Sequence, residues 1–90
     1  MSQDNSIDSV EVKRSYYESG ALRCEAPQVN GNMHGMIKEY YPSGALWVET
    51  PFVNGYKHGI SKEYNREKSS IVRLTLCNRG REVSTLRRKG

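Results

Sequence analysis

The sequence predicts an all-β protein, built as an elongated antiparallel sheet of successive β-hairpins. Two observations support this prediction: a 24-residue repeat, and two strand-length runs separated by a turn inside each copy. Residues 15–38 and 39–62 align without a gap and share 14 identical positions. A repeat of this length cannot bury its own hydrophobic face, so neighbouring copies must stack against one another.

The first connection in each repeat is a hairpin turn. In the second copy, the strand-forming residues 35–41 are followed by Pro42-Ser43-Gly44 and then by the run 45–50. Pro fixes φ near about −65° and Gly reaches positive φ easily, which suits a type I turn closed by a glycine bulge. Residues 18–20 repeat the same chemistry in the first copy.

Strict alternation from this turn pairs Tyr40 with Leu46, Lys38 with Val48 and Met36 with Thr50. It predicts one buried face, composed of Tyr16, Leu22, Cys24, Met36, Tyr40, Leu46, Val48, Ile60 and Tyr64, with the stems of Arg14, Lys38 and Lys62 over the rings. The opposite, half-exposed face is predicted to carry Tyr17, Ile37, Tyr41 and Trp47 among Glu25, Glu39, Glu49 and Glu63.

The second connection, at residues 27–35 and 51–59, contains an Asn-Gly pair, which is typical of a left-handed turn. After residue 64 the pattern decays, as expected for the last unit of a stack. The predicted organisation is a flexible N-terminal segment at residues 1–12 and a single repeat domain at 13–90. Its repeats lie at 15–38, 39–62 and, degenerate, 63–86, followed by a basic tail at 87–90.

Charge is distributed unevenly along the chain. Residues 1–65 hold 6 basic and 8 acidic side chains, whereas residues 66–90 hold 8 and 2. The C-terminal cluster can attract a polyanion, either nucleic acid or anionic lipid, and it can equally be a solvated tail. The candidate residues for polyanion binding are Arg79, Arg81, Arg87, Arg88 and Lys89.

Several features place the protein in the cytoplasm as an expectation. Residues 1–12 are polar and acidic rather than basic and then apolar, and no apolar run approaches the roughly 18 residues of a spanning helix. Cys24 and Cys77 are separated by more than two repeats, so the stacked sheet predicts two reduced thiols rather than a disulfide.

The motifs Tyr-Tyr-x-Ser-Gly-x-Leu and Asn-Gly-x-x-His-Gly-x-x-Lys-Glu-Tyr together resemble the MORN-repeat variant family of bacteria over residues 13–65. The resemblance implies a MORN-like sheet of hairpins used as a binding surface. The family includes proteins described as antitoxin components, and eukaryotic relatives with the classical repeat have been linked to membranes and phospholipids. Its signature is structural, so the resemblance implies fold more strongly than function.

No catalytic residue, metal site or cofactor is expected. His34 and His58 occupy the same phase of the repeat, roughly 9–10 Å apart, which is too far to share a zinc ion, and a structural role beside the backbone is the interpretation favoured for them. The sequence contains no phosphate-binding glycine loop, nucleophile elbow or Cys-x-x-Cys pair. The protein is therefore predicted not to be an enzyme.

The favoured function is protein–protein interaction through the aromatic side chains Tyr17, Tyr41 and Trp47. Tyr and Trp are over-represented among binding hot spots, although cross-strand packing would place the same residues there. The expected partner is a protein, either a cognate toxin or a second copy of the chain. Polyanion binding by the C-terminal segment is the alternative.

Overall fold

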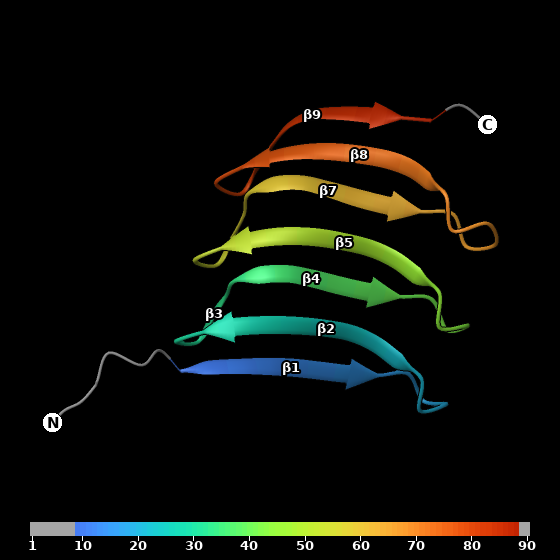
Figure 1. The fold of residues 1–90 in the computed structure, drawn as a ribbon, viewed down its shortest axis with the longest axis horizontal. Coiled ribbons are helices and arrows are strands. Elements are labelled where there is room, and N and C mark those ends of the chain that lie inside the picture. The colour runs from blue at the N-terminus through green and yellow to red at the C-terminus, as the bar shows by residue number, and fades with distance from the viewer. Residues whose placement is uncertain (1–8, 89–90) are drawn as a thin grey trace, which may run out of the picture.

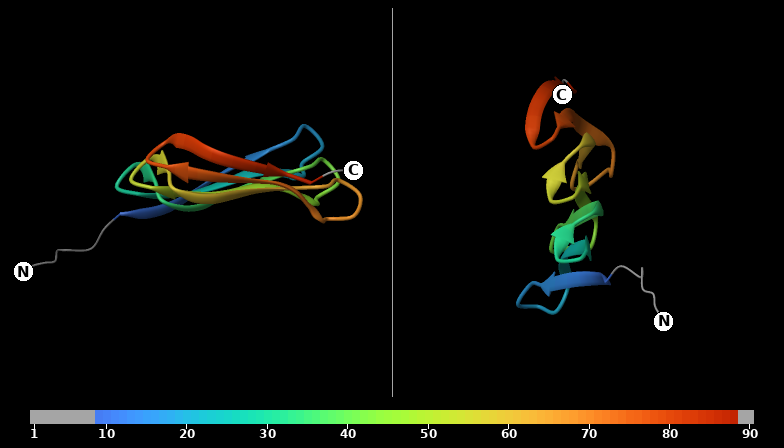
Figure 2. Two further views of the ribbon diagram at one scale, coloured as in Figure 1. Left: turned by 90° about the horizontal axis from the view of Figure 1, so that it is seen from above. Right: turned by 90° about the vertical axis from the view of Figure 1, so that its left-hand side faces the viewer.

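The structure, a computed structural model, describes residues 9–88, which form one antiparallel β-sheet in a single layer (Figures 1 and 2). Within these residues the strands are β1 (Val10–Tyr16), β2 (Leu22–Val29), β3 (Asn32–Met33), β4 (Gly35–Tyr40), β5 (Leu46–Val53), β6 (Tyr56–Lys57), β7 (Gly59–Tyr64), β8 (Ile71–Asn78) and β9 (Arg81–Arg87). No helix occurs among them. The predicted all-β fold of successive hairpins is confirmed.

The strands are ordered as they occur in the sequence. The main path is β1-β2-β4-β5-β7-β8-β9, and the two-residue strands β3 and β6 pair with the ends of β2 and β5 (Figure 1). Each repeat therefore contributes one long hairpin, and the next repeat is added beside it. Within the described residues, β1 and β9 are the two open edges of the sheet.

Both predicted turn types are present. In the β4–β5 turn, Gly44 N–H donates to Tyr41 O at 2.9 Å and Tyr41 N–H donates to Ala45 O at 2.8 Å, with Gly44 at φ +98°. These bonds define a type I turn closed by a glycine bulge. At the other end, Asn54 and Gly55 both have positive φ, as the primed two-residue turn requires.

A second β-bulge lies just inside each long hairpin, and it overturns part of the predicted register. Tyr40 pairs with Leu46 as predicted, but Glu39 pairs with Val48, so Trp47 has no directly opposite residue. Beyond this point Lys38 pairs with Glu49 rather than Val48, and Met36 with Pro51 rather than Thr50. The same irregularity recurs between Ser15 and Tyr16 and between Glu63 and Tyr64.

The bulges redistribute residues between the two faces of the sheet. The Tyr40 face includes Val10, Val12, Arg14, Tyr16, Leu22, Glu25, Met36, Lys38, Tyr40, Leu46, Glu49, Pro51, Ile60, Lys62, Tyr64, Leu74, Leu76 and Leu86. The Cys77 face comprises Cys24, Ala26, Ile37, Glu39, Val48, Thr50, Ser61, Glu63, Arg73, Thr75 and Cys77. The assignment of Cys24 and Val48 to the face of Tyr40 was wrong, as was that of Glu25 and Glu49 to the opposite face.

The more deeply buried side chains lie on the Cys77 face. Ile37 is 7% exposed, Cys77 3% and Thr50 7%, and no large side chain among residues 9–88 is completely enclosed. On the Tyr40 face, by contrast, Tyr16, Met36 and Ile60 are exposed. The prediction that the Tyr40 face is the buried one was therefore wrong.

The domain limits also differ from those predicted. β1 begins at Val10, so Val10–Val12 belong to the sheet, while residues 1–8 of the predicted N-terminal segment lie outside the described residues. At the other end, Arg87 closes β9 and is not part of a tail, and residues 89–90 lie outside the described part. Residues 66–88 continue the sheet through β8 and β9.

Candidate protein-binding surface

A shallow hollow of about 480 Å³ lies on the Cys77 face and crosses the middle of the sheet. Ile37 and Cys77 contribute to its lining and are the most buried hydrophobic side chains of the described residues. Met33 and Phe52 line it beside one end of the strands. A protein segment lying across the strands could pack its apolar side chains into this hollow.

Polar groups around the hollow are connected across neighbouring strands. Thr50 Oγ1 and Ser61 Oγ lie 3.0 Å apart and share a hydrogen bond between β5 and β7. Glu63 accepts from Trp47 Nε1 at 3.3 Å and forms an ion pair with Arg73, whose Nη2 lies 2.6 Å from Oε1. The hollow therefore combines an apolar lining with hydroxyl and carboxylate oxygens that can accept hydrogen bonds.

The three aromatic residues predicted to bind a partner all lie near the hairpin turns at one end of the strands, and all are half-buried. Tyr41 and Trp47 are in contact, with ring centroids 5.5 Å apart. Tyr17 donates its hydroxyl hydrogen to Tyr40 O at 2.6 Å, and Tyr41 donates to Tyr64 O at 2.7 Å. Each of these tyrosines thus connects its own repeat to the next, a structural role that the sequence did not reveal.

The two histidines connect neighbouring repeats in the same way at the opposite end of the strands. His34 Nδ1 accepts from the backbone N–H of Asn54 at 3.3 Å, and His58 Nδ1 accepts from that of Arg79 at 3.4 Å. An imidazole nitrogen that accepts a hydrogen bond carries no proton. Both histidines thus hydrogen-bond the backbone of the next turn, the contact expected for a structural role.

On the Tyr40 face, five charged side chains form one row across the middle of the strands: Arg14, Glu25, Lys38, Glu49 and Lys62. Arg14 Nε donates to Glu25 Oε2 at 2.9 Å. Tyr64 donates its hydroxyl hydrogen to Glu49, and this bond, with a smaller effect of burial, raises the pKa of Tyr64 to about 12. The three cations lie on the same face as Tyr16, Tyr40 and Tyr64, as predicted.

Cys24 and Cys77 are both free thiols on the Cys77 face. They lie on β2 and β8, four strand spacings or about 19 Å apart, well beyond the reach of a disulfide. Burial, helped by the neighbouring Glu39 carboxylate, raises the pKa of the Cys24 thiol. The Cys24 thiol is therefore not set up as a nucleophile.

The residues predicted to bind a polyanion do not form one cluster. The four C-terminal arginines are Arg79, Arg81, Arg87 and Arg88, and all of them are exposed. Arg79 and Arg81 lie at one end of β9 and Arg87 and Arg88 at the other, about 20 Å apart along the strand. Lys89 lies outside the described residues.

Sequence reasoning missed the residues that shape the hollow, notably Thr50, Ser61 and Cys77. Single hydroxyl side chains are common in ordinary strands, so the convergence of Thr50 from β5 and Ser61 from β7 had no distinctive signal in the sequence. Among residues 9–88, no group of three or more His, Cys, Asp or Glu side chains is placed to hold a metal ion. The same residues contain no helix long and apolar enough to span a bilayer.

Comparison with known proteins identifies one segment of this sheet. Residues 33–54, which comprise β4, β5 and the turn between them, match the model of the MORN repeat variant family. The resemblance that the sequence motifs showed is thus confirmed for this part of the chain. No curated protein and no solved structure matches the chain.

Proposed function

With a MORN repeat variant at residues 33–54, we propose that the chain is a non-catalytic protein-binding module whose Cys77 face receives a segment of a partner protein. MORN repeats are generally interaction modules, and the family resemblance makes a cognate toxin in the bacterial cytoplasm the first partner to test. The observation that carries the proposal is the hollow on the Cys77 face.

The chemistry of the hollow favours a protein segment. Its lining is apolar at Ile37, while Thr50, Ser61 and Glu63 present oxygens. An apolar side chain flanked by N–H donors or a basic group would satisfy both parts of this surface. Trp47 lies beside the hollow, held by Glu63, and can extend the contact as an aromatic anchor.

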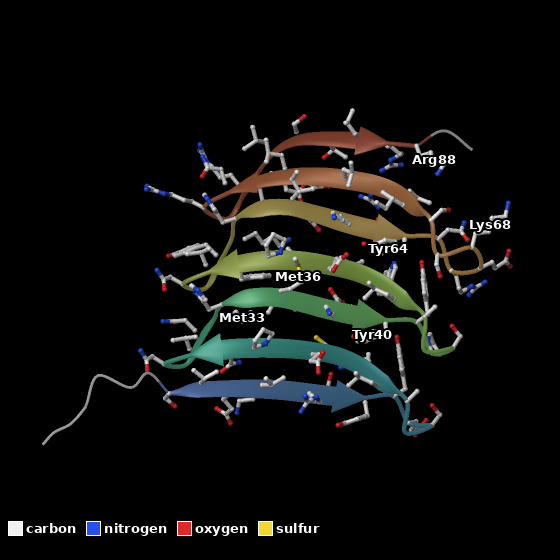
Figure 3. The ribbon with its side chains drawn as sticks, viewed as in Figure 1. Met33, Met36, Tyr40, Tyr64, Lys68 and Arg88 are labelled. Carbon is white, nitrogen blue, oxygen red and sulfur yellow. The ribbon has the colours of Figure 1, made fainter. Side chains whose placement is uncertain are left out.

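The test compares two methionines that have nearly equal exposure but lie on opposite faces. Met33 lines the hollow and is 37% exposed, and Met36 lies on the Tyr40 face and is 40% exposed (Figure 3). Purified wild type, Met33→Glu and Met36→Glu are each used to recover the product of the neighbouring reading frame. We expect Met33→Glu to reduce recovery at least about 10-fold, since a buried carboxylate without a partner opposes docking, and Met36→Glu to leave it unchanged.

Trp47→Ala tests the aromatic anchor separately. We expect weaker recovery from Trp47→Ala and near-normal recovery from Trp47→Phe, which preserves an aromatic ring beside Tyr41. Circular dichroism of each variant shows whether the sheet is intact. Equal recovery by folded Met33→Glu and wild type would show that the partner does not bind the Cys77 face.

A further inference from the structure

The Tyr40 face carries most of the large hydrophobic side chains that are exposed among residues 9–88. The exposed hydrophobic side chains on this face are Val10, Val12, Tyr16, Met36, Ile60, Leu76 and Leu86. They extend from β1 to β9. Stable domains normally bury such a face against a second layer, and a patch of this extent marks an interaction site.

The charges on the same face determine which second layer fits. Across the strand order β1-β2-β4-β5-β7, the middle row reads Arg14, Glu25, Lys38, Glu49 and Lys62, so the sign alternates at every strand. An alternating row is complementary to itself when it is reversed and displaced by one strand. A second copy of this chain therefore has the matching surface.

We propose that the Tyr40 face binds the Tyr40 face of a second copy, with a two-fold axis parallel to the strands and midway between β4 and β5. This axis places β4 over the partner's β5 and β2 over the partner's β7. Lys38 then lies opposite the partner's Glu49, and Glu25 lies opposite the partner's Lys62. Each of these contacts occurs twice because the interface is isologous.

The apolar rows on either side of the charges match under the same axis. Tyr40 lies opposite the partner's Leu46, and Met36 lies opposite the partner's Pro51, since each pair is already level in the sheet register. The two sheets would be separated by about 10 Å, the usual spacing of a β-sandwich. The charged row is thus flanked on both sides by apolar contacts.

Axes that pass through a strand, or that run across the strands along the charged row, place like charges together. An axis through β5 would put Glu49 opposite the partner's Glu49 and Lys38 opposite the partner's Lys62. An axis perpendicular to the strands would put every charge opposite its own copy. Like charges brought together in an interface are strongly unfavourable, so the row selects an axis between two strands. The axis between β4 and β5 combines four opposite-charge pairs with an overlap of six strands.

The overlap is large enough for a stable dimer. Six strands at about 4.8 Å spacing and three inward rows of side chains give about 600 Å² in projection for each partner. Interdigitating side chains raise the accessible area buried above its projection, toward the roughly 800 Å² per partner of standard interfaces. The sandwich would also supply the second layer that the single sheet lacks.

The first test measures mass in solution by sedimentation or light scattering over a concentration series. We expect the wild type to have the mass of two chains, and Met36→Glu to raise the dissociation constant at least about 100-fold, since symmetry buries the new carboxylate twice. Met33→Glu, on the other face, should remain dimeric. A wild type that is monomeric throughout, or dissociation caused equally by both variants, would overturn the proposal.

The second test uses charge reversal to check the arrangement of the strands. Lys38→Glu and Glu49→Lys each place like charges opposite one another in their own dimers, so each should be monomeric. When the two variants are mixed, the two substituted side chains face each other with opposite charges, and the unchanged Glu49 of the first variant faces the unchanged Lys38 of the second. A one-to-one heterodimer should therefore form. Failure of the folded variants to associate on mixing would refute the proposed axis.

The dimer and the proposed partner site can be separated experimentally because they lie on opposite faces. Met36→Glu should be monomeric and still recover the partner, whereas Met33→Glu should be dimeric and fail to recover it. If Met36→Glu is monomeric but Met33→Glu recovers the partner as well as the wild type does, the dimer proposal stands alone. If Met33→Glu fails to recover the partner but the wild type is monomeric, the binding module stands without the dimer.

Discussion

The tyrosine contacts between repeats predict a defined loss of stability on removal of a single hydroxyl group. In Tyr41→Phe, the half-buried ring remains in contact with Trp47, but the 2.7 Å bond to Tyr64 O is lost. A hydrogen bond of this kind contributes about 0.5–1.5 kcal/mol net, and leaving the carbonyl oxygen without its partner places the effect in the upper half of that range.

A change of about 1 kcal/mol shifts the melting temperature of a domain of this size by about 4–8 °C. Thermal and urea unfolding, followed by circular dichroism at one fixed protein concentration, measure both quantities. Fixed concentration matters because an associating protein has a concentration-dependent melting temperature. The matched control is Tyr56→Phe, which also removes one hydroxyl group but from an exposed ring.

Tyr17 provides an internal replicate of this prediction, since its hydroxyl makes the same bond one repeat earlier. Tyr17→Phe should destabilise the protein about as much as Tyr41→Phe, and the double variant should show the sum within about 0.5 kcal/mol. If Tyr41→Phe and Tyr56→Phe unfold at the same temperature, the hydroxyl bonds do not hold the repeats together and the reasoning fails.

Three further predictions concern pH, backbone strain and charge. The folded-state pKa of Tyr64 is about 12, above the ordinary value of about 10. Its bond to Glu49 therefore stabilises the fold fully below pH 10, and this stabilisation is lost as the pH rises toward 12. In a base titration, Tyr64→Phe should abolish the latest phase of tyrosinate absorbance. Gly59→Ala should destabilise the protein more than Gly44→Ala, as measured by urea unfolding. Both glycines have positive φ, which disfavours alanine by about 1 kcal/mol. Of the two, only Gly59 would bring its new Cβ against another residue, Pro51 Cγ at 2.9 Å. If the four C-terminal arginines bind a polyanion, replacing the pair at either end of β9 with serine should remove about 2 phosphate contacts. The retention on nucleic acid or anionic vesicles should then depend less steeply on salt concentration. No retention at low salt would exclude this alternative.

The hairpins were predictable because their turns are specified by residue type. Gly44 adopts the positive φ that the Pro-Ser-Gly sequence indicated, and Asn54 and Gly55 do so at the opposite edge. Position 79 shows the limit of this logic: Arg79 has φ +51° beside Gly80 and takes the place of Asn in the same kind of turn. The stacking of the repeats fixes the backbone conformation of this turn, although Arg rarely adopts a positive φ.

The faces were not predictable, because the bulge at Trp47 has no residue-type signature. One extra residue in β5 moves Val48 and Thr50 to the face of Ile37, and this shift creates the hollow. Strict alternation is correct on each side of the bulge and wrong across it. The hydroxyl partners of Tyr17 and Tyr41 were not predictable either, because they lie one repeat away and depend on the stacking offset.

The arrangement of bonds explains how a sheet with so little enclosed volume can keep two faces available for binding. The tyrosine and histidine connections between repeats are located at the strand ends, where Tyr41 reaches Tyr64 and His34 reaches Asn54. The middle of each face is consequently free of obligatory contacts with another layer. Substitutions such as Met33→Glu and Met36→Glu should therefore change monomer stability by less than about 0.5 kcal/mol, the usual range for surface positions. Measured on a monomeric background, that small effect would separate the residues that hold the repeats together from those that meet a partner.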